Sequence, residues 1–154
     1  MFCGQLLKTP QKTSGSYIQL SPAAPSTPIK SIGSPSANIG TFALAIFNQP
    51  AKTLNGKFVA AYVEETTAGQ MLKNWSEVTG KKATYAQVSL EDFNAVWPMW
   101  GMEMGVMMKM WDEVKEKSWS GEEGILTKED LGLNGVDFVG AKAVMKKMDW
   151  NALL

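Results

Sequence analysis

The stretch LNGKFVAAYVEETTAGQMLKNWSEVTGKKATYAQVSLEDF, residues 54–93, decides the fold class because strand-like and helix-like patterns alternate along it. Its first part, GKFVAAYVE (56–64), is a continuous apolar run of strand length. Such a run predicts a strand that is covered on both faces, as in a parallel sheet. A later part, ATYAQVS (83–89), predicts a second strand. A helical pattern lies between them, so this order predicts an α/β fold.

The helix between these two strands has signals at both ends. Thr67 and Gln70 have the spacing of a capping box at its start, and Gly80 is placed to end it. The positions expected to be buried are Met71, Leu72, Trp75 and Val78. The segment is therefore expected to form an amphipathic helix with one buried stripe.

Weaker patterns lie toward the N-terminus. SYIQL (16–20) predicts a short strand, and the Pro-rich segment 21–36 predicts an extended surface connection with one short strand around Ile29–Ile32. A helix follows, and Asn48 and Pro50 are expected to end it. Its expected buried face consists of Ile39, Phe42, Ala43, Ile46 and Phe47.

Toward the C-terminus, Ser89 with Asp92 predicts the start of another helix, which Pro98 breaks. A final helix is expected over residues 137–150. We therefore expect one domain over residues 1–154, with two or three central strands and four or five helices. Its parts are a strand and Pro-rich region (1–36), an α-β-α-β-α core (37–116), and an acidic loop with the terminal helix (117–154).

The segment WPMWGMEMGVMMKMWDEV (97–114) is unusually rich in Trp and Met. One helical stripe contains Trp100, Met104, Met107, Trp111 and Val114, and the opposite side contains Lys109, Asp112, Glu113 and Glu116. The pattern predicts an amphipathic helix, in which Gly101 and Gly105 would let another backbone or a flat ligand approach. Three interpretations stay open: core packing, the wall of a small-molecule pocket, or a protein interface.

The composition excludes several kinds of site. Fifteen lysines balance fifteen acidic residues, so charge gives no reason to expect a nucleic acid or a membrane as partner. The absence of His and Arg excludes Ser-His-Asp and Cys-His systems, the usual zinc sites and bidentate Arg clamps. The chain has a single cysteine, Cys3, and it contains no 18-residue apolar run and no secretory signal. From these observations we expect a cytoplasmic location.

The sequence also has no motif for nucleotide binding or catalysis. It contains no G-x-G-x-x-G and no P-loop. None of Tyr17, Tyr62 and Tyr85 is followed by Lys four residues later, so a Tyr-x-x-x-Lys pair is missing. The acidic segment SGEEGILTKEDLGLNG (120–135) does not match an EF-hand loop and is expected to be solvated. No catalytic residue, cofactor site or metal site is therefore assigned.

Three segments together resemble a known family. Residues 1–33 contain a polar turn, a strand, a Pro-rich loop and a short strand. SANIGTFALAIFNQP (36–50) is similar to a helix motif written D-x-G-x-F-V, and residues 54–93 follow a pattern of strand, capped helix, VTGKK turn and strand. On these segments, residues 1–115 resemble the C-terminal, substrate-binding half of NmrA-like proteins, an atypical branch of the short-chain dehydrogenase/reductase superfamily.

The resemblance implies a partial Rossmann-type fold with a short sheet, and an oxidoreductase-type role in fungal secondary metabolism. The family uses NAD(P), but the resemblance covers the substrate-binding half alone. The dinucleotide-binding half is therefore expected to be missing, which argues against hydride transfer by this chain alone. The resemblance places the substrate-binding residues at Phe2, Trp97, Met99, Trp100 and Met104.

Two other functions stay open: a non-catalytic regulatory or interaction module, and a cofactor-free isomerase or cyclase that uses Tyr, Asp or Glu. The expected partner is an apolar small molecule. A short sheet also leaves strand edges exposed, above all in GKFVAAYV (56–63). We therefore expect homodimerisation or association with a protein partner.

Overall fold

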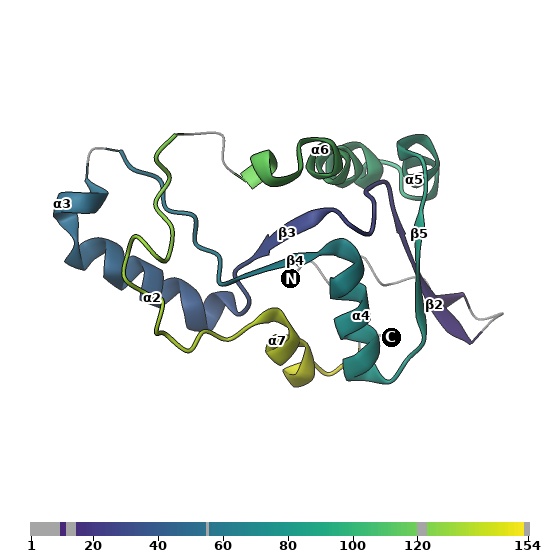
Figure 1. The fold of residues 1–154 in the computed structure, drawn as a ribbon. Helices are drawn as coiled ribbons and strands as arrows, with labels where there is room; N and C mark the ends of the chain where they lie inside the picture. Colours follow the sequence, from purple (N-terminus) through teal and green to yellow (C-terminus); the bar gives the residue numbers. More distant parts are fainter. Residues whose placement is uncertain (1–9, 12–14, 55, 120–122, 153–154) are drawn as a thin grey trace.

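The computed structural model describes residues 10–11, 15–54, 56–119 and 123–152. The elements are, in chain order, β1 (Pro10–Gln11), β2 (Ser16–Ser21), β3 (Pro28–Ser31), α2 (Pro35–Asn48), α3 (Pro50–Thr53), β4 (Glu64–Thr67), α4 (Ala68–Thr79), β5 (Ala83–Gln87), α5 (Leu90–Val96), the π-helical turn η1 (Gly101–Gly105), α6 (Val106–Val114), the 3-10 turn η2 (Lys115–Trp119) and α7 (Ala141–Lys147). Figure 1 shows β2 and β5 at one end of the molecule, α2 and α3 at the other, and the β3–β4 pair between them.

Two small sheets organise the chain. β2 and β5 pair in parallel, from Tyr17 opposite Ala83 to Ser21 opposite Gln87, and β1 adds an antiparallel strand beside β2. β3 and β4 form a separate antiparallel pair, and α4 connects β4 to β5. The predicted α/β class is confirmed, and the small parallel sheet is consistent with a partial Rossmann-like fold.

The strand predicted over residues 56–64 is wrong. Only Glu64 of this run belongs to a strand, and the preceding residues make a single parallel bridge from Val59 to Leu126. The Phe58 side chain is 60% exposed, so the run is not covered on both faces. An apolar run shows that burial would be favourable, but it does not supply the two neighbouring strands that a central strand needs.

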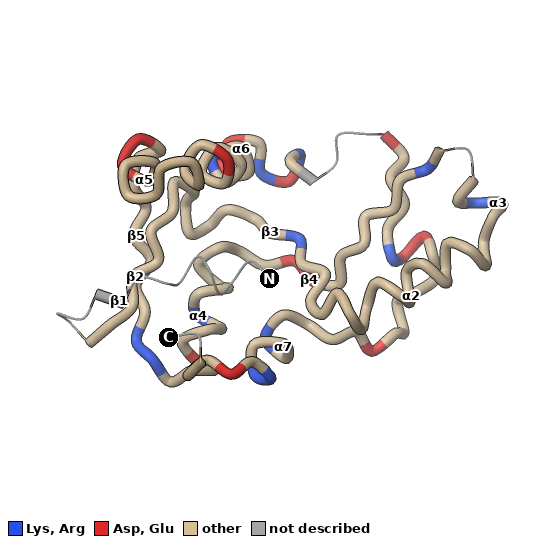
Figure 2. The backbone as a smooth tube through the Cα atoms, turned by 180° about the vertical axis from the view of Figure 1, so that it is seen from behind, with Lys and Arg blue, Asp and Glu red and all other residues tan. Residues whose placement is uncertain are grey.

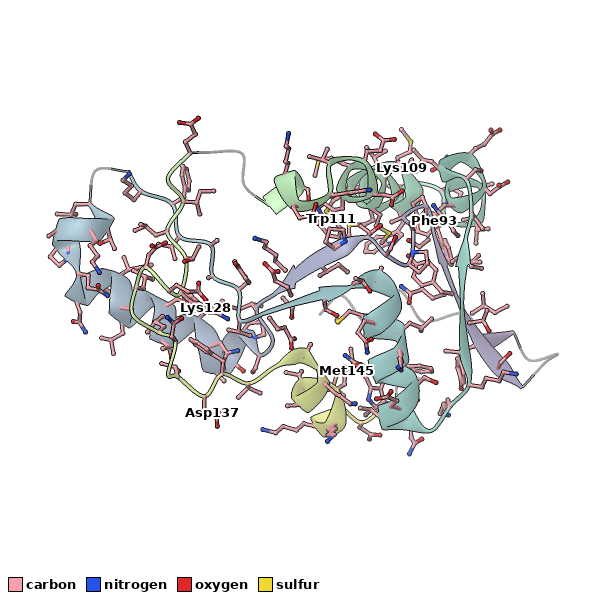
Figure 3. All side chains as sticks on the ribbon, in the orientation of Figure 1. Phe93, Lys109, Trp111, Lys128, Asp137 and Met145 are labelled. Carbon is pink, nitrogen blue, oxygen red and sulfur yellow. The ribbon has the colours of Figure 1, made fainter. Side chains whose placement is uncertain are left out.

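α4 matches its prediction closely. The Thr67 hydroxyl accepts a hydrogen bond of 3.2 Å from the Gln70 backbone N–H, and Gly80 ends the helix with a left-handed φ of 68°. Leu72 and Trp75 are buried, and Met145 of α7 packs against them (Figure 3). The capping box is one-sided, because the Gln70 side chain bonds to the Asn74 side chain rather than back to Thr67.

α2 forms where it was predicted, but with a different face inward. Asn38, Phe42 and Ala45 are buried, whereas Ile39 is 52% and Phe47 is 81% exposed. The Asn38 amide donates to the Ile32 and Val139 carbonyls at 2.7 and 2.9 Å and accepts from the Val139 N–H at 3.1 Å. These three bonds fit the observed rotation of the helix, because a buried amide is rarely left without partners.

The final helix is shorter than the predicted 137–150, since α7 spans only Ala141–Lys147. The Glu64 carboxylate accepts a hydrogen bond of 2.6 Å from the Ala141 N–H and so caps its first turn. The residues before it instead run beside α2, where the Phe138 ring stacks on Phe42 with centroids 5.3 Å apart. A long-range contact therefore decides where this helix begins.

Candidate functional site

The carboxyl ends of β2 and β5 lie at the same edge of the sheet, after Ser21 and Gln87. In open α/β sheets, ligands bind beyond this edge. Here the edge is followed by the loop 22–27 on one side and by α5, η1 and α6 on the other (Figure 1). The Met- and Trp-rich segment thus lies where the topology would place a ligand.

Two glycines let η1 pack closely on α5. A Cβ atom at Gly101 would lie 2.4 Å from the Asn94 Cα atom, and one at Gly105 would lie 2.9 Å from the Phe93 ring. The sequence left open whether a backbone or a flat ligand approaches these glycines. In the structure it is the backbone of α5. The absence of side chains at Gly101 and Gly105 therefore allows α5 and η1 to lie close together.

The buried face of this helix is a core cluster. Phe93 (labelled in Figure 3), Met104 and Met108 are almost completely buried together with Ala23. Trp97 and Trp100 are half-buried against them. Met108 was not in the predicted stripe, and Val114, which was, is 41% exposed. A π-helical turn has more residues than an α-helical one, so η1 changes the phase of the positions that follow it.

The predicted substrate-binding residues do not all meet. Trp97, Trp100 and Met104 belong to one cluster. Met99 is 83% exposed and has a positive φ of 69°, in the turn between α5 and η1. Phe2 lies outside the described residues. Their role in substrate binding stays a prediction.

Asp112 was expected on the solvated side of the helix, and this is wrong. Its side chain is only 16% exposed, and one carboxylate oxygen accepts bonds from the Ala24 N–H at 3.1 Å and the Thr27 hydroxyl at 2.8 Å. Burial opposes ionisation, but these bonds and the Lys109 ammonium outweigh it and lower the pKa of Asp112. Its spacing from Met104 and Met108 is the one sequence signal that points to this inward position.

Tyr85 holds the other side of the same loop. Its hydroxyl donates a hydrogen bond of 2.9 Å to the Ala23 carbonyl. Burial raises the pKa of this phenol, while a hydrogen bond with Ser21 opposes the shift. The hydroxyl is thus engaged in fixing the backbone of the loop.

A cavity of about 300 Å³ lies between β3, β4 and η2, and no sequence pattern indicates it. It is lined by Pro28, Ile29, Lys30, Glu65, Thr66, Thr67 and Glu116. Lys30 and Glu65 form an ion pair of 3.5 Å, and the Lys30 ammonium lies 4.4 Å from the centre of the Tyr62 ring. Trp97, Met99, Trp100 and Met104 do not line this cavity, because they lie in the α5–η1 part of the chain.

The strand-to-helix turns that begin α4 and α5 are occupied by groups of the protein itself. Phosphates bind where a helix N-terminus offers free N–H groups. At the start of α4, the N–H groups of Ala68 and Gly69 donate to the Thr27 and Pro25 carbonyls instead. α5 is capped by its own Ser89, and its first turn carries Glu91 and Asp92, whose charges repel phosphate (Figure 2).

Two other kinds of feature are absent from the described ranges. Within them, no three His, Cys, Asp or Glu side chains are placed to hold a metal ion. No helix there combines the length and apolar character needed to cross a bilayer. The candidate surface is therefore defined by its apolar residues and by the loop that Asp112 and Tyr85 hold.

Comparison with known proteins bears on the resemblance seen in the sequence. None of the curated proteins compared with this chain matches it. The model of the NmrA-like family, whose members have an NAD(P)-binding, oxidoreductase-type fold, matches residues 2–137. The match extends past the predicted 1–115 and covers most of the 154 residues. The chain therefore belongs to the NmrA-like family.

Proposed function

We propose that this chain provides the substrate-facing part of an NmrA-like, oxidoreductase-type protein of fungal small-molecule metabolism. It binds an apolar small molecule at the turn between α5 and η1 and does not hold the dinucleotide itself. The observation that carries the proposal is the position of Trp97 and Trp100, which are half-buried on an apolar cluster beside the exposed Met99. An apolar ligand that covered these side chains would gain about 25 cal/mol for each Å² removed from water.

The backbone at Met99 supports this location. A positive φ is unusual for a residue with a side chain and is concentrated at functional turns. Here it turns an exposed methionine outward between two half-buried tryptophans. Methionine is flexible and polarisable, which suits a surface that adapts to apolar ligands.

The test is a titration with an environment-sensitive apolar dye. We expect Met99→Asp to weaken dye binding by about tenfold, equivalent to about 1.4 kcal/mol. Met110→Asp is the control, because Met110 is also exposed but lies in α6, away from the turn that contains Met99. Equal effects of the two substitutions would reject the turn as the binding site.

A second titration addresses the cofactor. NADPH is added to the chain while its nicotinamide fluorescence is followed. We expect no binding at micromolar concentrations, because the N-termini of α4, α5 and α7 are occupied by the protein's own groups. Micromolar binding would overturn this part of the proposal.

A non-catalytic interaction module is the second candidate. It is favoured by the exposed apolar side chains on two separate parts of the molecule, which include Phe47 at 81% and Met102 at 72% exposure. Surface of this kind is typical of protein docking. Recovery of one stoichiometric protein partner with the purified chain, with no bound small molecule, would favour this candidate over the first.

A further inference from the structure

The outward face of α2 carries no charge. The helix Pro35–Asn48 contains no Lys, Asp or Glu, although a surface helix normally has charged residues on its solvent side. Ala37, Gly40, Leu44 and Phe47 are all exposed and follow one another at spacings of three or four residues. They therefore form one continuous face, opposite the buried Asn38, Phe42 and Ala45.

Gly40 has no role within the chain that explains it. A Cβ atom at this position would meet nothing within 4 Å, and its φ is not in the left-handed region. Glycine in a helix interior is destabilising relative to alanine. The absence of a side chain here would suit another surface that approaches α2 from outside.

The order of residues on this face makes it complementary to itself. The small residues Ala37 and Gly40 lie in the first half of the helix, and the large Leu44 and Phe47 lie in the second. The pairs 37–47 and 40–44 are both centred on position 42. If two copies of α2 packed antiparallel about a twofold axis at that position, each Phe47 would lie over the partner's Ala37 and each Leu44 over the partner's Gly40.

We propose that two copies of this chain dimerise through the outward faces of α2. No like charges oppose each other across the twofold axis, since the helix has none. Leu44 and Phe47, which are 61% and 81% exposed, are the large side chains of this face, so the contact is a small one and the dimer is expected to be weak and reversible.

Sedimentation equilibrium of the full chain tests this dimer. The wild-type chain is expected to dimerise reversibly. Gly40→Leu and Phe47→Ser are each expected to weaken the dimer by at least about tenfold, the first by blocking close approach and the second by removing the anchor. Met102→Ser is the matched control, because it changes a side chain that is 72% exposed on a different surface, and it should leave the dimer unchanged.

Urea unfolding at low protein concentration completes the test. Gly40→Leu should raise the urea midpoint of the monomer, because leucine favours the helix and meets no obstacle. The proposal is overturned if the wild-type chain is monomeric, or if Met102→Ser disrupts the dimer and Gly40→Leu does not. A lowered urea midpoint for Gly40→Leu would also overturn it. Dye binding at Met99 involves a different surface from α2, so the result of the dye titration does not depend on whether the chain dimerises.

Discussion

The Thr27 hydroxyl donates a hydrogen bond of 2.8 Å to the Asp112 carboxylate and so connects residues 85 positions apart. The same carboxylate oxygen accepts the Ala24 N–H at 3.1 Å. Through this pair of bonds, the loop that follows β2 is attached to α6, the helix that covers the carboxyl edge of the parallel strands. Asp112 therefore sets the position of the candidate surface relative to the sheet.

Removing this connection should destabilise the fold. Asp112→Ala leaves the partly buried Thr27 hydroxyl and Ala24 N–H without an acceptor, so we expect a loss of about 1–3 kcal/mol in the free energy of unfolding. Urea unfolding at neutral pH measures it. Glu113→Ala is the control, because Glu113 is 66% exposed in a 3.8 Å ion pair and should contribute no more than about 0.5 kcal/mol. Equal losses in the two variants would contradict the role given to Asp112.

The contribution of Asp112 should depend on pH. Its pKa is lower in the folded chain than the unfolded value of about 3.9, so its stabilising effect is fully present above that value. The effect is lost as pH falls from about 4 through the lower folded pKa. The stability difference between wild type and Asp112→Asn should therefore shrink in this acidic range. A difference that stays constant between neutral pH and about pH 3 would show that the carboxylate charge is not involved.

Three helical glycines should respond to alanine in different ways. Gly101→Ala would place a Cβ atom 2.4 Å from the Asn94 backbone, which cannot move aside easily, so we expect a loss of about 1–3 kcal/mol. Gly105→Ala should cost less, because its contacts are side chains of Leu90 and Phe93. Gly40→Ala meets open space and should stabilise the monomer by about 0.5–1 kcal/mol. Thermal unfolding of the three variants gives this order, and any stabilisation by Gly101→Ala would refute the close packing of α5 and η1.

Two adjacent glutamates provide a matched pair. Glu64 accepts the Ala141 N–H at 2.6 Å and caps α7, so Glu64→Ala should cost about 1–2 kcal/mol. Glu65 has a 67% exposed side chain and makes only a surface ion pair with Lys30, so Glu65→Ala should cost about 0.5 kcal/mol or less. Urea unfolding separates the two. A larger effect at Glu65 would mean that the cap does not stabilise α7.

Trp100 and Phe93 separate ligand binding from stability. Trp100 is half-buried, so Trp100→Ala should cost less than the roughly 3–5 kcal/mol typical of a fully buried aromatic residue, and it should weaken binding of the apolar dye. Phe93 is 1% exposed, and Phe93→Leu should lower stability while leaving dye affinity unchanged. Unfolding curves are measured beside dye titrations. Unchanged dye binding by Trp100→Ala would leave Trp100 as a core residue without a ligand role.

Local patterns in the sequence were sufficient for the parts of the fold that depend on neighbouring residues. The start of α4 at Thr67, its end at Gly80 and its buried Leu72 and Trp75 were all predicted, because caps and helical periodicity involve residues within a few positions of one another. The same holds for Ser89, which caps α5. The family and the α/β class also follow from these local patterns taken in order.

Tertiary structure alone decided the features that depend on distant partners. Asn38 turns α2 through bonds to Val139, about a hundred residues away, and Asp112 faces inward because Thr27 and Ala24 lie there to bond it. The apolar run 56–64 lacks strand neighbours on both sides, so it is not a strand despite its composition. Each outcome depends on which groups meet after folding, and a local apolar pattern does not contain that information.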